Sequence, residues 1–247
     1  MIRNIGIATS LSALMLTTAC AQEVEVNTAD RTAIEGVVRA YILENPEIIE
    51  DALIALAEKR DAEEEANAKL AIAENTDAIF SDARDYSIGP EDAAVTIVEF
   101  FDYHCGYCKA SADWASALPA QYDGQVRVVF KEFPILKPES RDAALAALAA
   151  GEQGKYVELH LALMAARGTL KATDIDRIAE RVGVDVEEMR IAMKTTANQQ
   201  QISDVRALAR LTGTTATPTF IIDGELVAGF DKDRLEQLIK DGIEAAG

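Results

Sequence analysis

Two cysteines three positions apart follow directly after an apolar run, and this arrangement constrains the chain more than any other feature. The run, VTIVEFF at residues 95–101, is β-branched and aromatic except for Glu99, which is typical of a buried central strand. The segment that starts at Cys105, CGYCKASADWASALPAQY, is predicted to be a helix. The chain has three cysteines, and a bridge between Cys105 and Cys108 would close too small a loop to staple a fold. The pair therefore points to chemistry.

The N-terminus has the layout of a secretory signal peptide over residues 1–21. Arg3 precedes an apolar stretch from Ile5 to Leu16, and small residues follow. Two cleavage sites fit. TTAC resembles a lipobox, which would leave Cys20 lipidated, whereas Ala19-Cys20-Ala21 fits an A-x-A site that removes Cys20. The sequence thus predicts a periplasmic or other extracytoplasmic protein, which the first cleavage site would anchor by a lipid on Cys20 and the second would leave free. No later stretch approaches 18 uninterrupted apolar residues, so we expect no membrane-spanning helix in the mature chain.

The composition excludes one class of partner. Lys and Arg number 24 against 42 Asp and Glu, which gives a formal net charge of −18. Such a chain repels nucleic acid. Its apolar content of 49% is enough for a substantial core, and we interpret the acidity as a solvated surface.

Residues 28–82 are predicted to be helical. Thr32 and Glu35 fit a capping box at the start of a first helix. Asn45 and Pro46 then end it and begin a second, with Asn45 as its N-cap. The apolar side chains recur at helical spacing and form a stripe: Ile34, Val37, Val38, Tyr41, Ile42, Ile49, Ala52, Leu53 and Leu56. Residues 58–75 are charged and alanine-rich, as in an exposed stalk. We expect the stripe to be covered by self-association into a dimer or trimer.

Residues 83–247 are predicted to form an α/β domain. After a loop at 81–94 come a strand at 95–101, a helix and a second strand from Val126, the order of a parallel βαβ unit. A helical insertion at about 139–212 follows, with Ser140 capping its first helix. A hairpin at Asp223-Gly224 and a final helix complete the chain. Without the insertion this order is that of a thioredoxin-like fold.

Helix position predicts different roles for the two thiols. Cys105 lies at the helix N-terminus, where unpaired N–H groups stabilise a thiolate, so it should be the nucleophile. Cys108, one turn further, should be the buried resolving thiol. Glu99 is predicted to be a buried acid with a raised pKa that exchanges protons with Cys108, and Lys131 in the next strand is a candidate ion-pair partner for it.

Three further residues are candidates for contact with a substrate. Pro218 after Thr217 can be a cis-proline that faces the cysteines, whose neighbouring backbone would hydrogen-bond an extended peptide. His104 is a candidate that either tunes the site or is only exposed. His160 is expected to pack within a helix bundle.

A zinc site would need more ligands, and haem attachment would need His where Lys109 stands. A copper(I) site of two thiolates, with or without His104, remains an alternative.

The segments AAVTIVEFFDYHCGYCKAS and TPTFIIDGELVAG together resemble the DsbA family of exported thiol:disulfide oxidoreductases, over about residues 85–247. The segment VVRAYILENPEIIEDALIAL resembles the extra N-terminal helices of the branch that includes ScsC and Com-type surface proteins. The resemblance implies Cys105 as attacking thiol, Cys108 as its partner, Glu99 as buried acid and Pro218 as cis-proline. His104 departs from the usual pattern, and Thr217 is similar to the residue in isomerase-type relatives.

Two classes of function follow from the sequence. The first is an enzyme, without a cofactor, that oxidises or isomerises disulfides of reduced or misoxidised exported proteins and exchanges electrons with a membrane redox partner. The second is a copper(I)-binding or surface-anchored interaction protein whose thiols are incidental. The expected site contains no metal.

Overall fold

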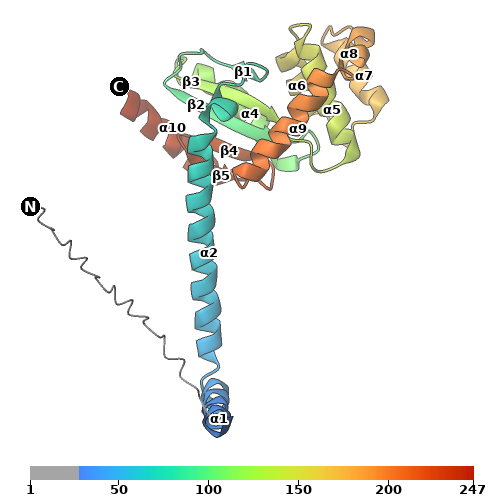
Figure 1. The fold of residues 1–247 in the computed structure, drawn as a ribbon. Helices are drawn as coiled ribbons and strands as arrows, with labels where there is room; N and C mark the ends of the chain where they lie inside the picture. Colours follow the sequence, from blue (N-terminus) through green and yellow to red (C-terminus); the bar gives the residue numbers. More distant parts are fainter. Residues whose placement is uncertain (1–27) are drawn as a thin grey trace, which may run out of the picture. The chain divides into compact units, whose positions relative to one another are not determined.

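The computed structural model describes residues 28–247 and divides the chain into two compact units between Ala57 and Glu58. Figure 1 gives the order of the helices and strands. In this described part, none of the helices has the length and apolar character needed to cross a membrane. The proposed signal peptide and Cys20 lie outside the described residues.

The first unit contains α1 (Thr28–Glu44) and the beginning of α2 (Glu47–Glu74). The break at residues 45–46 is confirmed, but both predicted caps are wrong. Thr32 lies inside α1, which has already begun at Thr28. Asn45 closes α1 rather than opening α2, because its side-chain amide donates to the carbonyl oxygen of Tyr41 at 2.8 Å. The stripe of apolar side chains is exposed on this unit.

A five-stranded sheet in the order β1-β3-β2-β4-β5 forms the centre of the second unit. Its strands are β1 (Tyr86–Ile88), β2 (Val95–Phe101), β3 (Val126–Glu132), β4 (Thr219–Ile222) and β5 (Glu225–Ala228). Only β2 and β3 are parallel, as the βαβ pattern predicts. The loop predicted at 81–94 contains β1, which pairs with β3 and is too short to show a period in sequence. The predicted hairpin is confirmed, since Asp223 and Gly224 both take the positive φ that such a turn requires (47° and 85°).

Both faces of the sheet are covered by helices. On one face, α4 (Gly106–Gln121) and α10 (Lys232–Ala246) pack on Val95, Ile97 and Phe101. On the other face, Val98 and Phe100 share a cluster with α9 (Thr196–Leu211) and with Ile72 and Ile79, which come from the end of α2 and from α3 (Thr76–Phe80). The predicted domain start at residue 83 therefore differs from the compact unit, which begins at Glu58. The end of the predicted stalk is part of this core.

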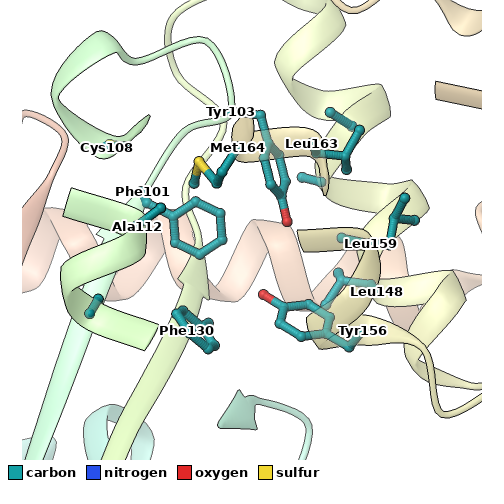
Figure 2. Close-up of a cluster of buried hydrophobic side chains, with 14 of the residues drawn as sticks. Phe101, Tyr103, Cys108, Ala112, Phe130, Leu148, Tyr156, Leu159, Leu163 and Met164 are labelled. Carbon is teal, nitrogen blue, oxygen red and sulfur yellow. The ribbon is translucent and has the colours of Figure 1, made fainter. Parts of the chain in front are cut away.

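The predicted helical insertion is made of five helices between β3 and β4 (Figure 1). They are α5 (Pro138–Gly151), α6 (Tyr156–Ala165), α7 (Ala172–Arg181), α8 (Val186–Ala192) and α9. The predicted cap Ser140 is wrong, because Lys137 is the N-cap and Pro138 the first helical residue. Alanines let α5 pack closely, and they fill much of its buried face. Figure 2 shows the α6 side chains Tyr156, Leu159 and Leu163 in the cluster that contains Phe101 and Phe130.

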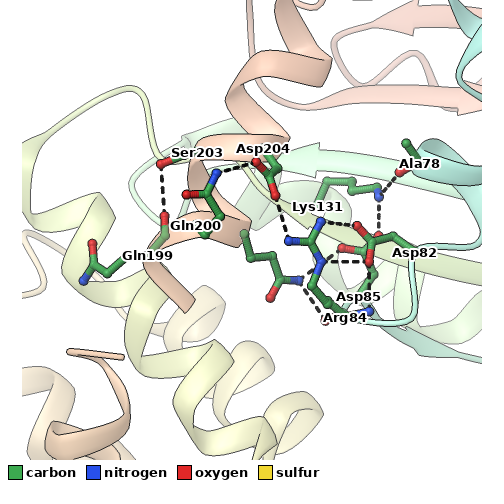
Figure 3. A network of polar contacts seen from close by, with 10 residues as sticks. Ala78, Asp82, Arg84, Asp85, Lys131, Gln199, Gln200, Ser203 and Asp204 are labelled. Atoms are coloured by element: carbon green, nitrogen blue, oxygen red, sulfur yellow. Dashed lines mark hydrogen bonds and ion pairs between the residues drawn. The ribbon is translucent and has the colours of Figure 1, made fainter. Parts of the chain in front are cut away.

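Lys131 does not pair with Glu99, which corrects the expected ion pair. Phe100 lies opposite Lys131 and Glu99 lies opposite Phe130, so the two charged side chains belong to opposite faces of the sheet. Lys131 is fully buried, and its ammonium donates to Asp85 and to the carbonyl oxygen of Ala78. Figure 3 shows how this pair joins the segment before β1 to the sheet.

We predict that Asp85→Ala lowers the free energy of unfolding by about 3–5 kcal/mol, because it leaves a buried ammonium without its anion. Replacing both partners, Asp85→Leu with Lys131→Met, should cost less, since no buried charge remains. Urea unfolding measures both. A loss below about 1 kcal/mol for Asp85→Ala would show that this ammonium is solvated in solution.

Candidate active site

Cys105 is the N-cap of α4, as its position in the sequence predicts. Its sulfur accepts a hydrogen bond from the backbone N–H of Cys108 at 3.4 Å. In the thiol state, Sγ donates to the carbonyl oxygen of Thr217 at 3.1 Å. The residue is 6% exposed, so the sulfur lies at the surface of a packed site. A hydrogen bond from the Cys108 thiol, together with hydrogen bonds from the backbone of α4, lowers the pKa of Cys105 to about 5. At neutral pH this sulfur is a thiolate.

The surroundings of Cys108 raise the pKa of its thiol, whereas those of Cys105 lower it. Cys108 is 0% exposed, and burial raises the pKa of its thiol above the ordinary value. Its hydrogen bond to Cys105 raises that pKa further, because the proton stabilises the neighbouring sulfur. The pair therefore shares one proton, and that proton resides on Cys108.

Glu99 lies in β2 on the face that carries α4. Only 2% of it is exposed, and burial raises its pKa to about 8, with a smaller contribution from the charge of Cys105. The Ser111 hydroxyl lies 3.0 Å from both Glu99 Oε1 and the carbonyl oxygen of Cys108, and it donates its one proton to either of them. The carboxyl is therefore held beside the helical turn that carries the resolving thiol. At neutral pH it retains its proton.

Thr217 and Pro218 stand immediately before β4, and the peptide bond between them is cis. The carbonyl oxygen of Thr217 accepts the hydrogen bond from Cys105 in its thiol state. The carbonyl oxygen of Pro218 accepts from the N–H of Gly229 at 2.8 Å. The Thr217 hydroxyl is buried without a hydrogen-bond partner, so it is free to donate to the thiolate. The sequence prediction that this segment faces the cysteines is confirmed.

His104 does not offer its ring to a substrate, contrary to the prediction. Its side chain is buried, and both ring nitrogens are engaged. Nε2 accepts from the N–H of Leu170 at 3.0 Å, so Nδ1 carries the proton and donates to Ser140 Oγ at 2.9 Å. Burial lowers the pKa of His104, which keeps the ring neutral. The residue ties the active-site loop to the helical insertion.

Asp102 and Lys109 complete the connection between the site and the insertion. Asp102 Oδ1 accepts from the N–H of His104 and from the Ser140 hydroxyl, both at 2.7 Å. On the other side of the cysteines, the Lys109 ammonium donates to the last carbonyl groups of α6 at 2.7–3.1 Å: Leu163, Met164 and Ala166. Burial lowers the pKa of Lys109.

His160 is the packing residue that the sequence predicts. Burial lowers its pKa to about 3, and its Nδ1 lies 3.1 Å from the hydroxyl of Tyr103. Tyr103 and Tyr156 both donate to Glu132 Oε1 at 2.9 Å, and Figure 2 shows the two rings with their hydroxyls directed to the same space. Burial raises the pKa of Glu132, so the whole group is uncharged at neutral pH.

The chain belongs to the thioredoxin family, whose family model, described as "Thioredoxin", matches residues 81–241. A second model, the N-terminal domain of the copper resistance protein ScsC, matches residues 30–64. The predicted resemblance to DsbA-like and ScsC-type oxidoreductases is thereby confirmed, as is the thioredoxin-like fold with an N-terminal helical segment.

Three solved structures are similar to this chain. A thioredoxin-like oxidoreductase from Silicibacter pomeroyi is 38% identical with a TM-score of 0.65, over 70% of this chain and 99% of its own. A linker-deletion mutant of Proteus mirabilis ScsC is 26% identical with a TM-score of 0.67, over 90% and 98%. The thiol-disulfide exchange protein α-DsbA2 from Wolbachia pipientis is 30% identical with a TM-score of 0.66, over 72% and 96%. The chain therefore has the fold of thiol-disulfide oxidoreductases.

Curated relatives match over a shorter part. A Na⁺/H⁺ antiporter, NhaA 3 of Salinispora tropica, is 34% identical over 143 residues, which are 57% of this chain. The chain spans only 22% of that protein's length, so the similarity concerns one part of the antiporter.

Sequence reasoning missed four residues of the site. Ser111 carried a readable signal, since it is three positions after Cys108 and so on the same helical face. Asp102 and Lys109 flank the motif but gave no indication of their distant partners, which lie between 33 and 57 positions away. Ser140 was interpreted as a helix cap, which is the ordinary use of serine at such a place.

We predict that alkylation of the reduced protein by iodoacetamide reaches half its maximal rate at about pH 5, because the rate follows the Cys105 thiolate. In Cys108→Ala this midpoint should rise, since the thiol that donates to Cys105 is lost. Unfolded protein in urea, with an ordinary thiol pKa of about 8.5, is the control. A wild-type midpoint above pH 7 would contradict the stabilised thiolate.

Proposed function

We propose that this chain is an exported thiol:disulfide oxidoreductase that acts on disulfides of exported proteins through Cys105 and Cys108. The single observation that carries the proposal is the asymmetry of the pair: an N-cap sulfur with a pKa of about 5 beside a fully buried thiol with a raised pKa. A structural pair would not need one ionised member. The family and the similar structures support the same chemistry.

In the reducing direction, the Cys105 thiolate attacks one sulfur of a client disulfide. The client S–S bond breaks, a client thiolate leaves, and Cys105 is held in a mixed disulfide. Cys108 then loses its proton and attacks Cys105, which releases the second client thiolate and leaves a Cys105–Cys108 disulfide. Oxidation of a client is the same sequence in reverse, and isomerisation ends after reattack by a client thiolate.

Glu99 is proposed to carry the proton of Cys108. When a client thiolate attacks an oxidised pair, Cys108 leaves as a buried thiolate that needs a proton. A carboxyl with a pKa of about 8 holds a proton at neutral pH, and Ser111 keeps it beside the turn of Cys108. The same carboxyl, once ionised, can accept the proton in the reverse direction.

We predict that Cys108→Ala accumulates mixed disulfides with client proteins, because the attacking thiol is present and the resolving thiol is absent. Cys105→Ala should accumulate none, since Cys108 is buried. Non-reducing gels and mass spectrometry after acid quenching measure the adducts. Equal trapping by both variants would contradict the assigned roles.

We predict that Glu99→Gln slows disulfide exchange by about a hundredfold. In the oxidising direction the wild-type rate should fall as pH rises toward 8, because Glu99, without the neighbouring charge of Cys105, then loses the proton that Cys108 needs. The variant should lack this step. Glu132→Gln, a second buried carboxyl that is bound to tyrosines, is the matched control and should retain it. An unchanged step at pH 8 in Glu99→Gln would contradict the proton-carrier role.

Self-association through the first unit is proposed to direct the enzyme toward isomerisation. Ten large apolar side chains are exposed on the first unit between residues 34 and 56, and that unit itself does not bury them. So large an apolar surface on short helices calls for a partner. A dimer or trimer would offer several Cys105 sites to one misoxidised client and so raise the effective concentration of thiolate.

We predict that the full chain is a dimer or trimer, and that Val37→Glu with Leu53→Glu makes it monomeric. Isomerisation of scrambled substrate should fall, while oxidation of reduced substrate should persist or increase. The matched control, Ala62→Glu with Ala66→Glu, adds the same charge to an exposed stretch of α2 and should remain oligomeric. Light scattering measures the mass, and a monomeric wild type would refute this part of the proposal.

Location and partners are also proposals. The layout of residues 1–21 supports export, and the intact mass of the mature protein would show whether Cys20 is retained and acylated. Clients would be reduced or misoxidised exported proteins, with a membrane protein as redox partner. The copper(I) alternative is less favoured, because both nitrogens of His104 are engaged and only the two sulfurs remain as ligands.

A further inference from the structure

Three exposed basic side chains flank the active-site loop on a chain whose formal net charge is −18. They are Lys137, at the start of α5, and Arg167 and Lys171, in the connection between α6 and α7. We call these three residues the cationic rim. The redox chemistry described above does not use their charges.

Hydrogen bonds between distant segments place the cationic rim beside Cys105. The neighbouring residue His104 accepts a hydrogen bond from the N–H of Leu170 at 3.0 Å, and Lys171 follows Leu170. The Lys137 ammonium lies 3.4 Å from the hydroxyl of Thr169, in the same connection. The positive charge of Lys137 also acts on the ring of His104. The two segments that carry the rim therefore meet at the residue before the nucleophile.

Hydrogen bonds hold the two segments that carry the cationic rim in place. Lys109, one residue after Cys108, binds the carbonyl group of Ala166 at 2.7 Å, immediately before Arg167. Figure 2 shows Leu163 and Met164, at the end of α6, beside Tyr103 of the active-site loop. The hydrogen bond from the Ser140 hydroxyl to Asp102 likewise holds the start of α5 against the active-site loop. The position of the rim is thus set by the groups that position the cysteines.

Within the described chain, no acidic side chain forms an ion pair with the rim, although three other basic residues of the insertion are paired. Lys155, Arg177 and Arg190 each bind a carboxylate at 2.6–3.0 Å. Two acids stand near the rim. Glu139 acts on His104. Asp174 is bound to Arg177, and it also accepts the backbone N–H of Lys171 at 3.3 Å and feels the charge of that side chain. The charges of the rim are therefore available to another molecule.

Two exposed apolar side chains belong to the same segments as the cysteines and the rim. Tyr107, between the two cysteines, is 72% exposed, and Leu136, adjacent to Lys137, is 49% exposed. A client segment that reaches Cys105 would meet an apolar contact and then positive charge. Elsewhere, the net negative charge of the chain disfavours acidic segments.

We propose that the cationic rim binds acidic side chains of the client close to the disulfide that Cys105 attacks. The preferred substrates are then disulfides flanked by Asp or Glu. This inference rests on the proposed function of the site and adds a substrate class to it. Exposed charge pairs are individually weak, so the preference should come from the three residues together.

The test uses full-length reduced protein and two peptide disulfides that differ only in flanking residues, two Asp in one and two Ser in the other. The second-order rate constant of cleavage is measured for each, and the acidic-to-neutral ratio is compared between variants. Lys137→Glu, Arg167→Glu and Lys171→Glu together should lower this ratio by about tenfold, roughly twofold per charge. In wild type, raising the salt concentration should lower the ratio too.

The matched control carries Lys194→Glu, Arg206→Glu and Lys240→Glu, which change the net charge equally at exposed positions outside the rim segments. Its ratio should stay within about twofold of wild type, since only long-range repulsion changes. An equal fall of the acidic-to-neutral ratio in both triple variants would contradict the proposed role of the rim and would assign the preference to net charge. A wild-type ratio of about one, with both peptides cleaved, would overturn the rim and leave the oxidoreductase intact. Failure to cleave either peptide would overturn the proposed function and the rim with it.

Discussion

The carboxylate of Asp102 is the interaction on which the site depends. It accepts four hydrogen bonds: from the N–H of His104 and the hydroxyl of Ser140 on Oδ1, and from the N–H groups of Ile135 and Leu136 on Oδ2. These donors belong to the active-site loop, to the first helix of the insertion and to the segment after β3. A buried carboxylate with four donors is stable only in one arrangement of those segments. It therefore fixes where α4 begins, and with it the position of Cys105.

The sulfur of Cys105 has a structural and a chemical role at once. A helix N-terminus calls for an acceptor, and serine or aspartate is the usual choice. Here the acceptor is Sγ, which receives the N–H of Cys108. The interactions that cap α4 are thus the ones that stabilise negative charge on the nucleophile. Burial of Cys108 stabilises the thiolate of Cys105 further, because a thiol that stays protonated can donate a hydrogen bond to the neighbouring sulfur.

Local features of the sequence predicted the central part of this fold, and contacts between distant segments account for the errors. The strand at 95–101, the N-cap at Cys105 and the Asp223-Gly224 hairpin are each specified by adjacent residues. Lys131 was assigned to the wrong partner because its face depends on register, and a shift of one residue changes the face. The sequence at the end of α2 predicts a solvated stalk. Ile72 from this end and Ile79 from α3 are instead buried in the cluster that contains Val98 and Phe100. His104 looked available because nothing near it in sequence indicates Ser140 or Leu170.

The pKa of Glu99 depends on the state of Cys105, which links proton transfer to the redox step. Burial of the carboxyl is the main cause of the raised pKa. The smaller contribution comes from the charge on Cys105, and that charge disappears when the sulfur enters a disulfide. The carboxyl thus releases its proton more readily while Cys105 is bonded to a client or to Cys108, and regains it when the thiolate returns. In the proposed oxidising reaction, a buried Cys108 thiolate is produced while Cys105 is bonded to the client. The proton is therefore most easily released at the stage at which the reaction requires it.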